Sequence, residues 1–132
     1  MAKLLHAQIL VDGLTTPAYH VLNAAFEHAM NAPADSIHRL PLVDVYKRAH
    51  LATRTSRLHF AQIVESAKHA TVELDRVDIT HPENEAEHIG CWPAFEATAV
   101  TDTHFEFTFC RYVRLDRVFF SGYWRSGNGS PQ

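Results

Sequence analysis

The chain has 132 residues, of which 46% are hydrophobic and 20% are charged. These values are typical of a globular domain of ordinary size, and they exclude a disordered chain. Two cysteines are too few for a disulfide framework, and no apolar stretch approaches the roughly 18 residues of a transmembrane helix. We therefore expect a cytoplasmic protein with no membrane association, folded over residues 1–125 and ending in a flexible tail at 126–132.

The formal charge is −3, but the charged residues are unevenly distributed along the chain. Residues 71–106 contain nine acidic residues and one base, whereas residues 47–57 contain four bases and no acid. Two such surfaces could recruit a partner protein or neutralise each other within the fold, and we favour the second interpretation. The acidic balance and the lack of a recognisable motif argue against nucleic-acid binding.

The N-terminal third predicts a strand followed by a helix. Residues 4–12 alternate between apolar and polar side chains, which is typical of a strand, and Gly13 then interrupts the pattern. Thr16 is the expected helix cap and Pro17 suits the first helical position, so a helix should run to about Asn31. Its apolar stripe consists of Ala18, Val21, Leu22, Ala25, Phe26, Ala29 and Met30.

Residues 37–52 allow two interpretations. Residues 37–46 fit an extended run broken by Pro41, but the apolar spacing beyond this proline also fits a helix from Leu42 to about Ala52, which we favour. A further helix is predicted from Ser56 or Arg57 to His69. Its apolar stripe consists of Phe60, Ile63, Val64 and Ala67.

From residue 70 onward the pattern is typical of strands. Residues 71–79 are rich in β-forming residues, with a slip in alternation around Arg76 that indicates a bulge. Residues 94–113 predict a hairpin that turns near Asp102, and residues 117–124 predict a final strand. The fold class is therefore α+β: a two-layer sandwich with an N-terminal strand, two or three helices and a curved antiparallel sheet.

The stretch THPENEAEHIGC, residues 80–91, is dense in reactive side chains. Thr80 and Glu83 have the spacing of a capping box, and Gly90 supplies a stop signal. Acidic residues in a first helical turn are favoured by the helix dipole. We therefore predict a short capped helix at the surface, which needs no ligand to explain its composition.

The same stretch also allows a metal site. On a helix, Glu85 and His88 would be neighbours on one face, and His81 could complete a three-ligand site for zinc or a similar divalent ion. The isolated motif is weak, so we expect no cofactor and keep the metal as an alternative.

The hairpin suggests a ligand pocket. Phe105, Phe107, Phe109 and Arg111 alternate onto one face, so a guanidinium would enter the core unless the strand ends before it. We predict an aromatic-lined pocket between sheet and helices. The candidate ligand-binding residues are Trp92, Glu96, His104, Phe107, Phe109 and Arg111.

Large aromatic side chains occupy both faces of the predicted last strand, which indicates a covered sheet and favours a homodimer. The functional hypothesis is a small-molecule binder or a cofactor-independent enzyme that uses histidine or glutamate. The sequence does not identify catalytic residues, and leaves open whether there is a reaction. The alternative is a non-catalytic interaction module that uses the acidic and basic surfaces, and a metal-binding protein is the third hypothesis.

Overall fold

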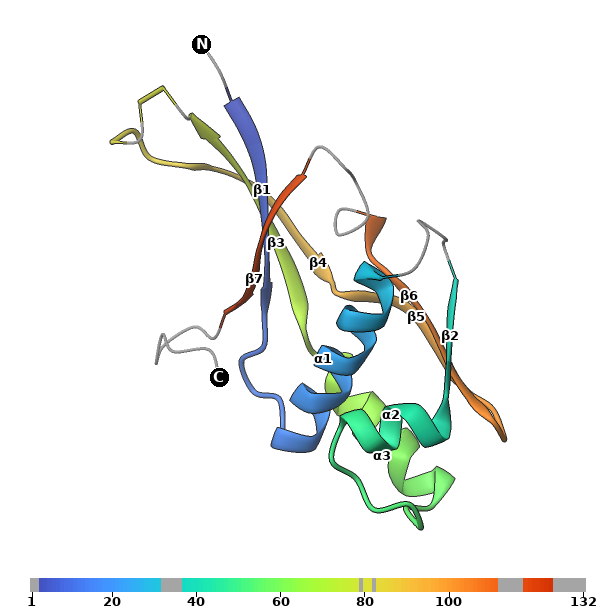
Figure 1. Cartoon of the computed structure of the whole chain (residues 1–132). Coiled ribbons are helices and arrows are strands. Elements are labelled where there is room, and N and C mark those ends of the chain that lie inside the picture. The colour runs from blue at the N-terminus through green and yellow to red at the C-terminus, as the bar shows by residue number, and fades with distance from the viewer. Residues whose placement is uncertain (1–2, 32–36, 79, 82, 112–117, 125–132) are drawn as a thin grey trace.

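A computed structural model describes residues 3–31, 37–78, 80–81, 83–111 and 118–124, with side chains described over 5–31, 37–78, 80–81 and 83–111. Its elements confirm the predicted α+β class (Figure 1). None of the described helices has the length and apolar composition to cross a bilayer. The elements are β1 (Lys3–Leu10), α1 (Thr16–Met30), β2 (His38–Pro41), α2 (Leu42–Arg48), α3 (Arg57–Ala67), β3 (Thr71–Asp78), β4 (Glu87–Pro93), β5 (Phe95–Val100), β6 (His104–Phe109) and β7 (Val118–Trp124).

The strands form two sheets instead of one curved sheet. One sheet has the order β4-β3-β1-β7 and the other has the order β2-β6-β5. Figure 1 shows the two sheets diverging, with α1 in the angle between them. The chain passes from the first sheet to the second between β4 and β5, where the fully buried Ala94 separates the two strands.

The sheets are antiparallel with one exception. The β1–β3, β3–β4, β2–β6 and β5–β6 pairs are antiparallel, but β7 lies parallel to β1. The predicted antiparallel arrangement is therefore wrong for β7. Alternation of apolar residues defines the faces of a strand but not its direction, so the sequence pattern could not reveal this pairing.

Helix α1 begins at Thr16, the residue predicted to cap it, so the cap lies one residue earlier than predicted. Thr15, not Thr16, is the N-cap, because its Oγ1 accepts a hydrogen bond of 3.3 Å from the backbone N–H of Ala18. Pro17 lies in the first turn, at the second helical position instead of the predicted first. Helix α3 is capped by Ser56, whose Oγ accepts a 3.0 Å hydrogen bond from the N–H of His59.

Both interpretations of residues 37–52 are partly correct, because Pro41 is the boundary between strand β2 and helix α2. The helix ends at Arg48, earlier than predicted. His50 has a φ of 60°, and the N–H groups of His50 and Leu51 donate to the carbonyls of Lys47 and Tyr46. This pattern is a Schellman motif with histidine at the left-handed position, which stops the helix.

The predicted capped helix within residues 80–91 does not form, because Glu87–Pro93 is strand β4. Thr80 does not act as a helix cap; its N–H and hydroxyl both donate to Oδ1 of Asp78, at 3.0 and 2.7 Å. Glu87 pairs with Arg76 across the β3–β4 hairpin, at 3.0 Å between Oε1 and Nη1. Pairing with β3 therefore overrides the local helix signals.

The core between the layers is aromatic. Phe60 of α3 meets Phe105 of β6 edge to face, and the Phe95 and Phe109 rings are stacked with centroids 4.9 Å apart. Phe107 lies between these rings, and all five side chains are at most 4% exposed. Burial of rings this large contributes strongly to the stability of the fold.

Candidate functional site

A pocket lies at the bend where the chain passes from β4 to β5. Its cavity volume is about 280 Å³. Phe95 and Cys110 are buried residues of its lining, whereas Pro93, Glu96 and Arg111 are exposed. Buried and exposed residues together form a site with an apolar floor and a polar rim. The lining residues are Trp92, Pro93, Phe95, Glu96, Cys110 and Arg111.

Backbone hydrogen bonds hold the bend in place. The N–H of Ala94 donates to the carbonyl of Ala70 at 2.9 Å, and its carbonyl accepts from the N–H of Cys110 at 2.8 Å. The register of the β5–β6 pair shifts between Phe95 and Ala97, which leaves Glu96 as an extra residue. Bulges of this kind redirect a side chain, and this one lies at the pocket.

Three of the predicted ligand-binding residues meet at this pocket: Trp92, Glu96 and Arg111. Strand β6 ends at Phe109 and the side chain of Arg111 is exposed, so the guanidinium does not enter the core. The other two predicted aromatic residues, Phe107 and Phe109, are not part of the pocket lining. Phe107 and Phe109 are each 1% exposed within the aromatic core.

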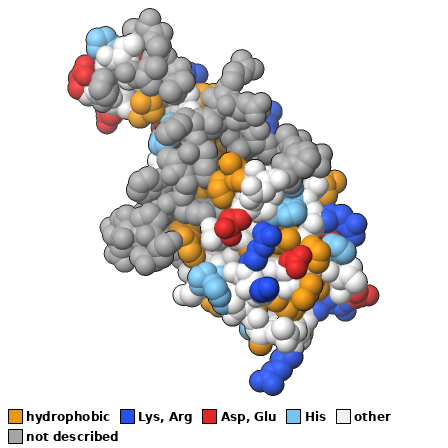
Figure 2. All heavy atoms as spheres, viewed as in Figure 1, with side chains coloured by type: hydrophobic (Ala, Val, Ile, Leu, Met, Phe, Trp, Pro, Cys, Tyr) orange, Lys and Arg blue, Asp and Glu red, His pale blue; other side chains and the backbone are white. Residues whose placement is uncertain are grey.

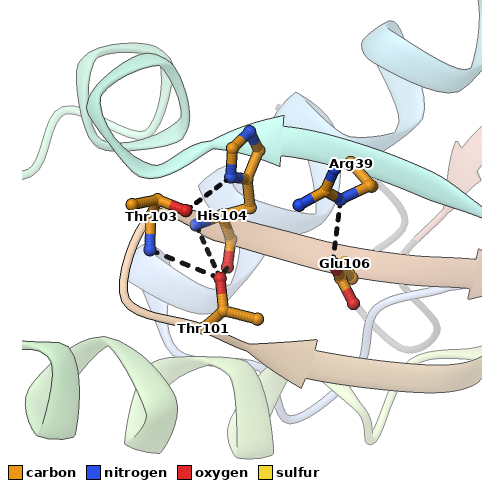
Figure 3. A network of polar contacts seen from close by, with 5 residues as sticks. All are labelled: Arg39, Thr101, Thr103, His104 and Glu106. Carbon is orange, nitrogen blue, oxygen red and sulfur yellow. Dashed lines mark hydrogen bonds and ion pairs between the residues drawn. The ribbon is translucent and has the colours of Figure 1, made fainter.

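His104 lies at the opposite end of β6, roughly 20 Å from Cys110 at 3.3 Å per residue. Figure 3 shows it in the β5–β6 turn, where its N–H donates to Oγ1 of Thr101 at 3.0 Å and its Nδ1 lies 2.8 Å from Oγ1 of Thr103. The nearby pair between Arg39 Nε and Glu106 Oε2, at 2.8 Å, joins β2 to β6. This network stabilises the turn and is separate from the pocket.

The residues predicted to bind metal do not share a helical face. His81 lies in the β3–β4 connection, with its Nδ1 3.3 Å from Oε1 of Glu83, and Glu85 precedes β4. His88 lies on β4, with its Nδ1 3.2 Å from Oδ1 of Asp75 on β3. Neither His81 nor Glu85 joins the group of potential ligands that the described residues form around His88.

That group consists of Glu73, Asp75 and His88, whose potential ligand atoms all lie within 4.8 Å of one another. Sequence reasoning missed both carboxylates. The sequence does place Glu73 and Asp75 two residues apart on a predicted strand, and such residues share a face. The distance between these carboxylates and His88, however, depends on how β3 pairs with β4, which the sequence does not show.

The acidic and basic segments partly neutralise each other within the chain. Arg57, from the basic segment, forms an ion pair with Asp102, from the acidic segment. Figure 2 shows basic, acidic and histidine side chains interspersed over the coloured part of this face, not separated by sign. This mixing weakens the interpretation of two separate docking surfaces.

No protein-family model, curated protein or solved structure matches this chain. Its function must therefore be inferred from its own residues.

Proposed function

We propose that the pocket at the β4–β5 bend binds a small ligand with an anionic group and a flat apolar part. The supporting observation is that Trp92, Glu96 and Arg111 line one cavity. A guanidinium suits a carboxylate or phosphate, and an indole offers a flat apolar surface. The volume of about 280 Å³ is near the lower end of the usual range, roughly 300–1,000 Å³, so the ligand is small.

Binding is favoured over catalysis. The titratable groups of the lining are Glu96, Cys110 and Arg111, and none of the described lining residues is a histidine. Cys110 is buried, and the described lining offers it no imidazole base, so its thiol is a poor nucleophile. Glu96 is better suited to accept a hydrogen bond from a ligand hydroxyl or amino group than to drive a reaction alone.

Fluorescence provides the test. The chain has two tryptophans, so Trp124→Phe leaves Trp92 as the sole indole fluorophore. Titration with phenyl phosphate and with benzoate should quench or shift its emission. Arg111→Gln should weaken binding at least about tenfold, because a charge-assisted hydrogen bond is lost.

Arg54→Gln is the matched control, because this exposed arginine lies in the connection between α2 and α3, outside the pocket lining. It should leave both affinities unchanged. Equal losses in the two variants would indicate nonspecific attraction of anions, and no change with Arg111→Gln would rule out the proposed anion site. Native mass spectrometry of untagged protein would show whether a natural ligand is retained.

We also propose that the protein is a homodimer. Strand β7 lies at the edge of its sheet, and an edge strand offers unpaired backbone groups to a second chain. The aromatic side chains of residues 118–124, which first suggested a dimer, lie outside the described side chains. The same mass spectrum tests this proposal: a dimer mass is expected, and a monomer at micromolar concentration would contradict it.

A reducing compartment, such as the cytoplasm, fits the cysteines. Cys91 is exposed and Cys110 is buried, and both thiols are free. Exposed thiols persist where glutathione and thioredoxin keep them reduced. Fractionation of cells that express the untagged chain should recover it with cytoplasmic markers, and recovery in a secreted fraction would contradict this assignment.

A further inference from the structure

The face of the β4-β3-β1-β7 sheet that points away from the core carries a second cluster of polar residues. On β3, Val72 and Leu74 are buried, so Glu73 and Asp75 must project from the opposite face. The antiparallel pairing sets His6 of β1 across from Asp75. On the other side of β3, His88 of β4 lies across from Asp75.

The position of His88 depends on an irregularity in the sheet. Thr71 to Leu74 pair with β4 in one register, in which Leu74 lies across from Gly90. The register then shifts by one residue, so Asp75 lies across from His88. Without the shift, Asp75 would lie across from Ile89. The bulge therefore places an imidazole beside two carboxylates where an isoleucine would otherwise stand.

The three side chains are arranged closely. Potential ligand atoms of Glu73, Asp75 and His88 all lie within 4.8 Å of one another, and His88 Nδ1 is 3.2 Å from Asp75 Oδ1. The Asp75 side chain is only 15% exposed, whereas that of His88 is 59% exposed. Two neighbouring carboxylates repel each other, and partial burial of one of them strengthens the repulsion, so a bound cation would be favoured.

We propose that Glu73, Asp75 and His88 form a binding site for a divalent transition-metal ion of the Zn²⁺ type. Carboxylate oxygens accept many divalent ions, but an imidazole nitrogen favours zinc and its transition-metal neighbours over Mg²⁺ and Ca²⁺. Three protein ligands leave a position for water or for a fourth ligand, and His6 is on the same face. This site is independent of the pocket at the β4–β5 bend.

A metal-free explanation of the cluster also exists. A protonated His88 could neutralise Asp75 through the observed contact without any ion. The two explanations differ in what Glu73 does, because a metal ion requires its carboxylate while a His88–Asp75 pair does not. The test therefore centres on Glu73.

The experiment is titration of chelator-treated full-length protein with ZnCl₂, at neutral pH, against a chromophoric zinc indicator. One equivalent of Zn²⁺ should bind, and Mg²⁺ should compete poorly. Glu73→Gln, Asp75→Asn and His88→Ala should each lower the Zn²⁺ affinity by more than about tenfold, because even groups that only support ligands contribute this much. Circular dichroism and the Tm of each metal-free variant establish that it is folded.

Three matched variants serve as controls. His81→Ala and Glu85→Gln remove the other potential ligands of the β3–β4 connection, and Cys91→Ser removes the exposed thiol of β4, which lies across from Glu73. All three should bind Zn²⁺ like the unmodified protein. Co²⁺ bound in place of Zn²⁺ provides a second measurement, because its visible spectrum reports nitrogen and oxygen ligation without thiolate.

Several results would overturn the site. Absence of stoichiometric Zn²⁺ binding would favour the ion pair of His88 and Asp75, as would an unchanged affinity in Glu73→Gln. Loss of binding in His81→Ala and Glu85→Gln, but not in Glu73→Gln, would move the site into the β3–β4 connection. Equal affinity for Mg²⁺ and Zn²⁺ would contradict a role for the imidazole.

Discussion

The two faces of β3 carry different kinds of side chain. Val72 and Leu74 are at most 1% exposed and pack on the core, whereas Glu73 and Asp75, from the same four residues, form a polar cluster on the other face. Because a strand alternates its side chains, one segment contributes to stability and to a candidate site at once. The comparison predicts that changes on the two faces have separable effects, on folding and on ion binding.

The largest effect is expected in the buried core, to which the inner face of β3 belongs. Phe107→Ala should destabilise the protein by about 3–5 kcal/mol, because its ring is 1% exposed and contacts the rings of Phe95, Phe105 and Phe109. Urea denaturation measures this loss. The Zn²⁺ affinity of the folded fraction should stay unchanged. A loss below about 1 kcal/mol would contradict tight packing of Phe107 in the aromatic core.

The outer face should respond to metal instead. At a free Zn²⁺ concentration of 100 times its Kd, the free energy of unfolding should rise by about 2.7 kcal/mol. At the same Zn²⁺ concentration, Glu73→Gln should reduce this gain to about 1.4 kcal/mol or less, because its affinity falls by more than about tenfold. It should change the metal-free stability by only about 0.5 kcal/mol, because the half-buried Glu73 lies outside the apolar core. A large loss of metal-free stability in Glu73→Gln would break the separation between the two faces.

A smaller effect is expected at Gly90, where the sheet meets the pocket. A Cβ at this position would lie 2.6 Å from Cη2 of Trp92, so Gly90→Ala must displace the indole. We expect a stability loss of about 1 kcal/mol and a shift in Trp92 emission in the Trp124→Phe background. Cys91→Ala, at the neighbouring position, should leave the emission unchanged. An unshifted spectrum in Gly90→Ala would mean that the indole does not rest on Gly90.

The smallest expected effect is on the pH dependence of stability, and it comes from His28 at the edge of the core. His28 contacts the rings of His38 and Phe107. Burial, followed by the charge of Arg48, lowers its pKa below 6.5, against the opposing effect of Asp44. The unfolded chain therefore binds the proton more tightly, so stability should fall as the pH drops through 6.5.

His28→Gln should flatten this dependence, measured as Tm between pH 7.5 and 5.5. An unchanged slope would assign the pH dependence to other groups.

Periodicity in the sequence predicted most of the secondary structure. The helix beginning at Thr16 and the strand pattern of residues 71–78 both follow from apolar spacing, because a buried stripe or face is needed to pack on a core. Residues 80–91 were misassigned. The Thr80 hydroxyl is bound to Asp78 and Glu87 pairs with Arg76, and such partners depend on strand pairing that local spacing does not encode.

The candidate sites were only partly predictable for the same reason. His88 was identified, but its neighbours Glu73 and Asp75 come from another strand, in a register that shifts at a bulge. Arg111 was identified as anomalous on a core face. Its exposure follows from the end of β6 at Phe109, and strand ends are poorly defined by alternation alone.

The parallel pairing of β1 with β7 also constrains how the chain is made. Strand β1 leaves the ribosome before both of its partners, β3 and β7, and β7 emerges after every other strand of its sheet. Pairings between such distant segments form slowly, and an unpaired edge can associate with other chains meanwhile. The edge of β1 that pairs with β7 therefore stays unpaired until residues 118–124 have been made, and a chain that stalls before them would have a sheet one strand short.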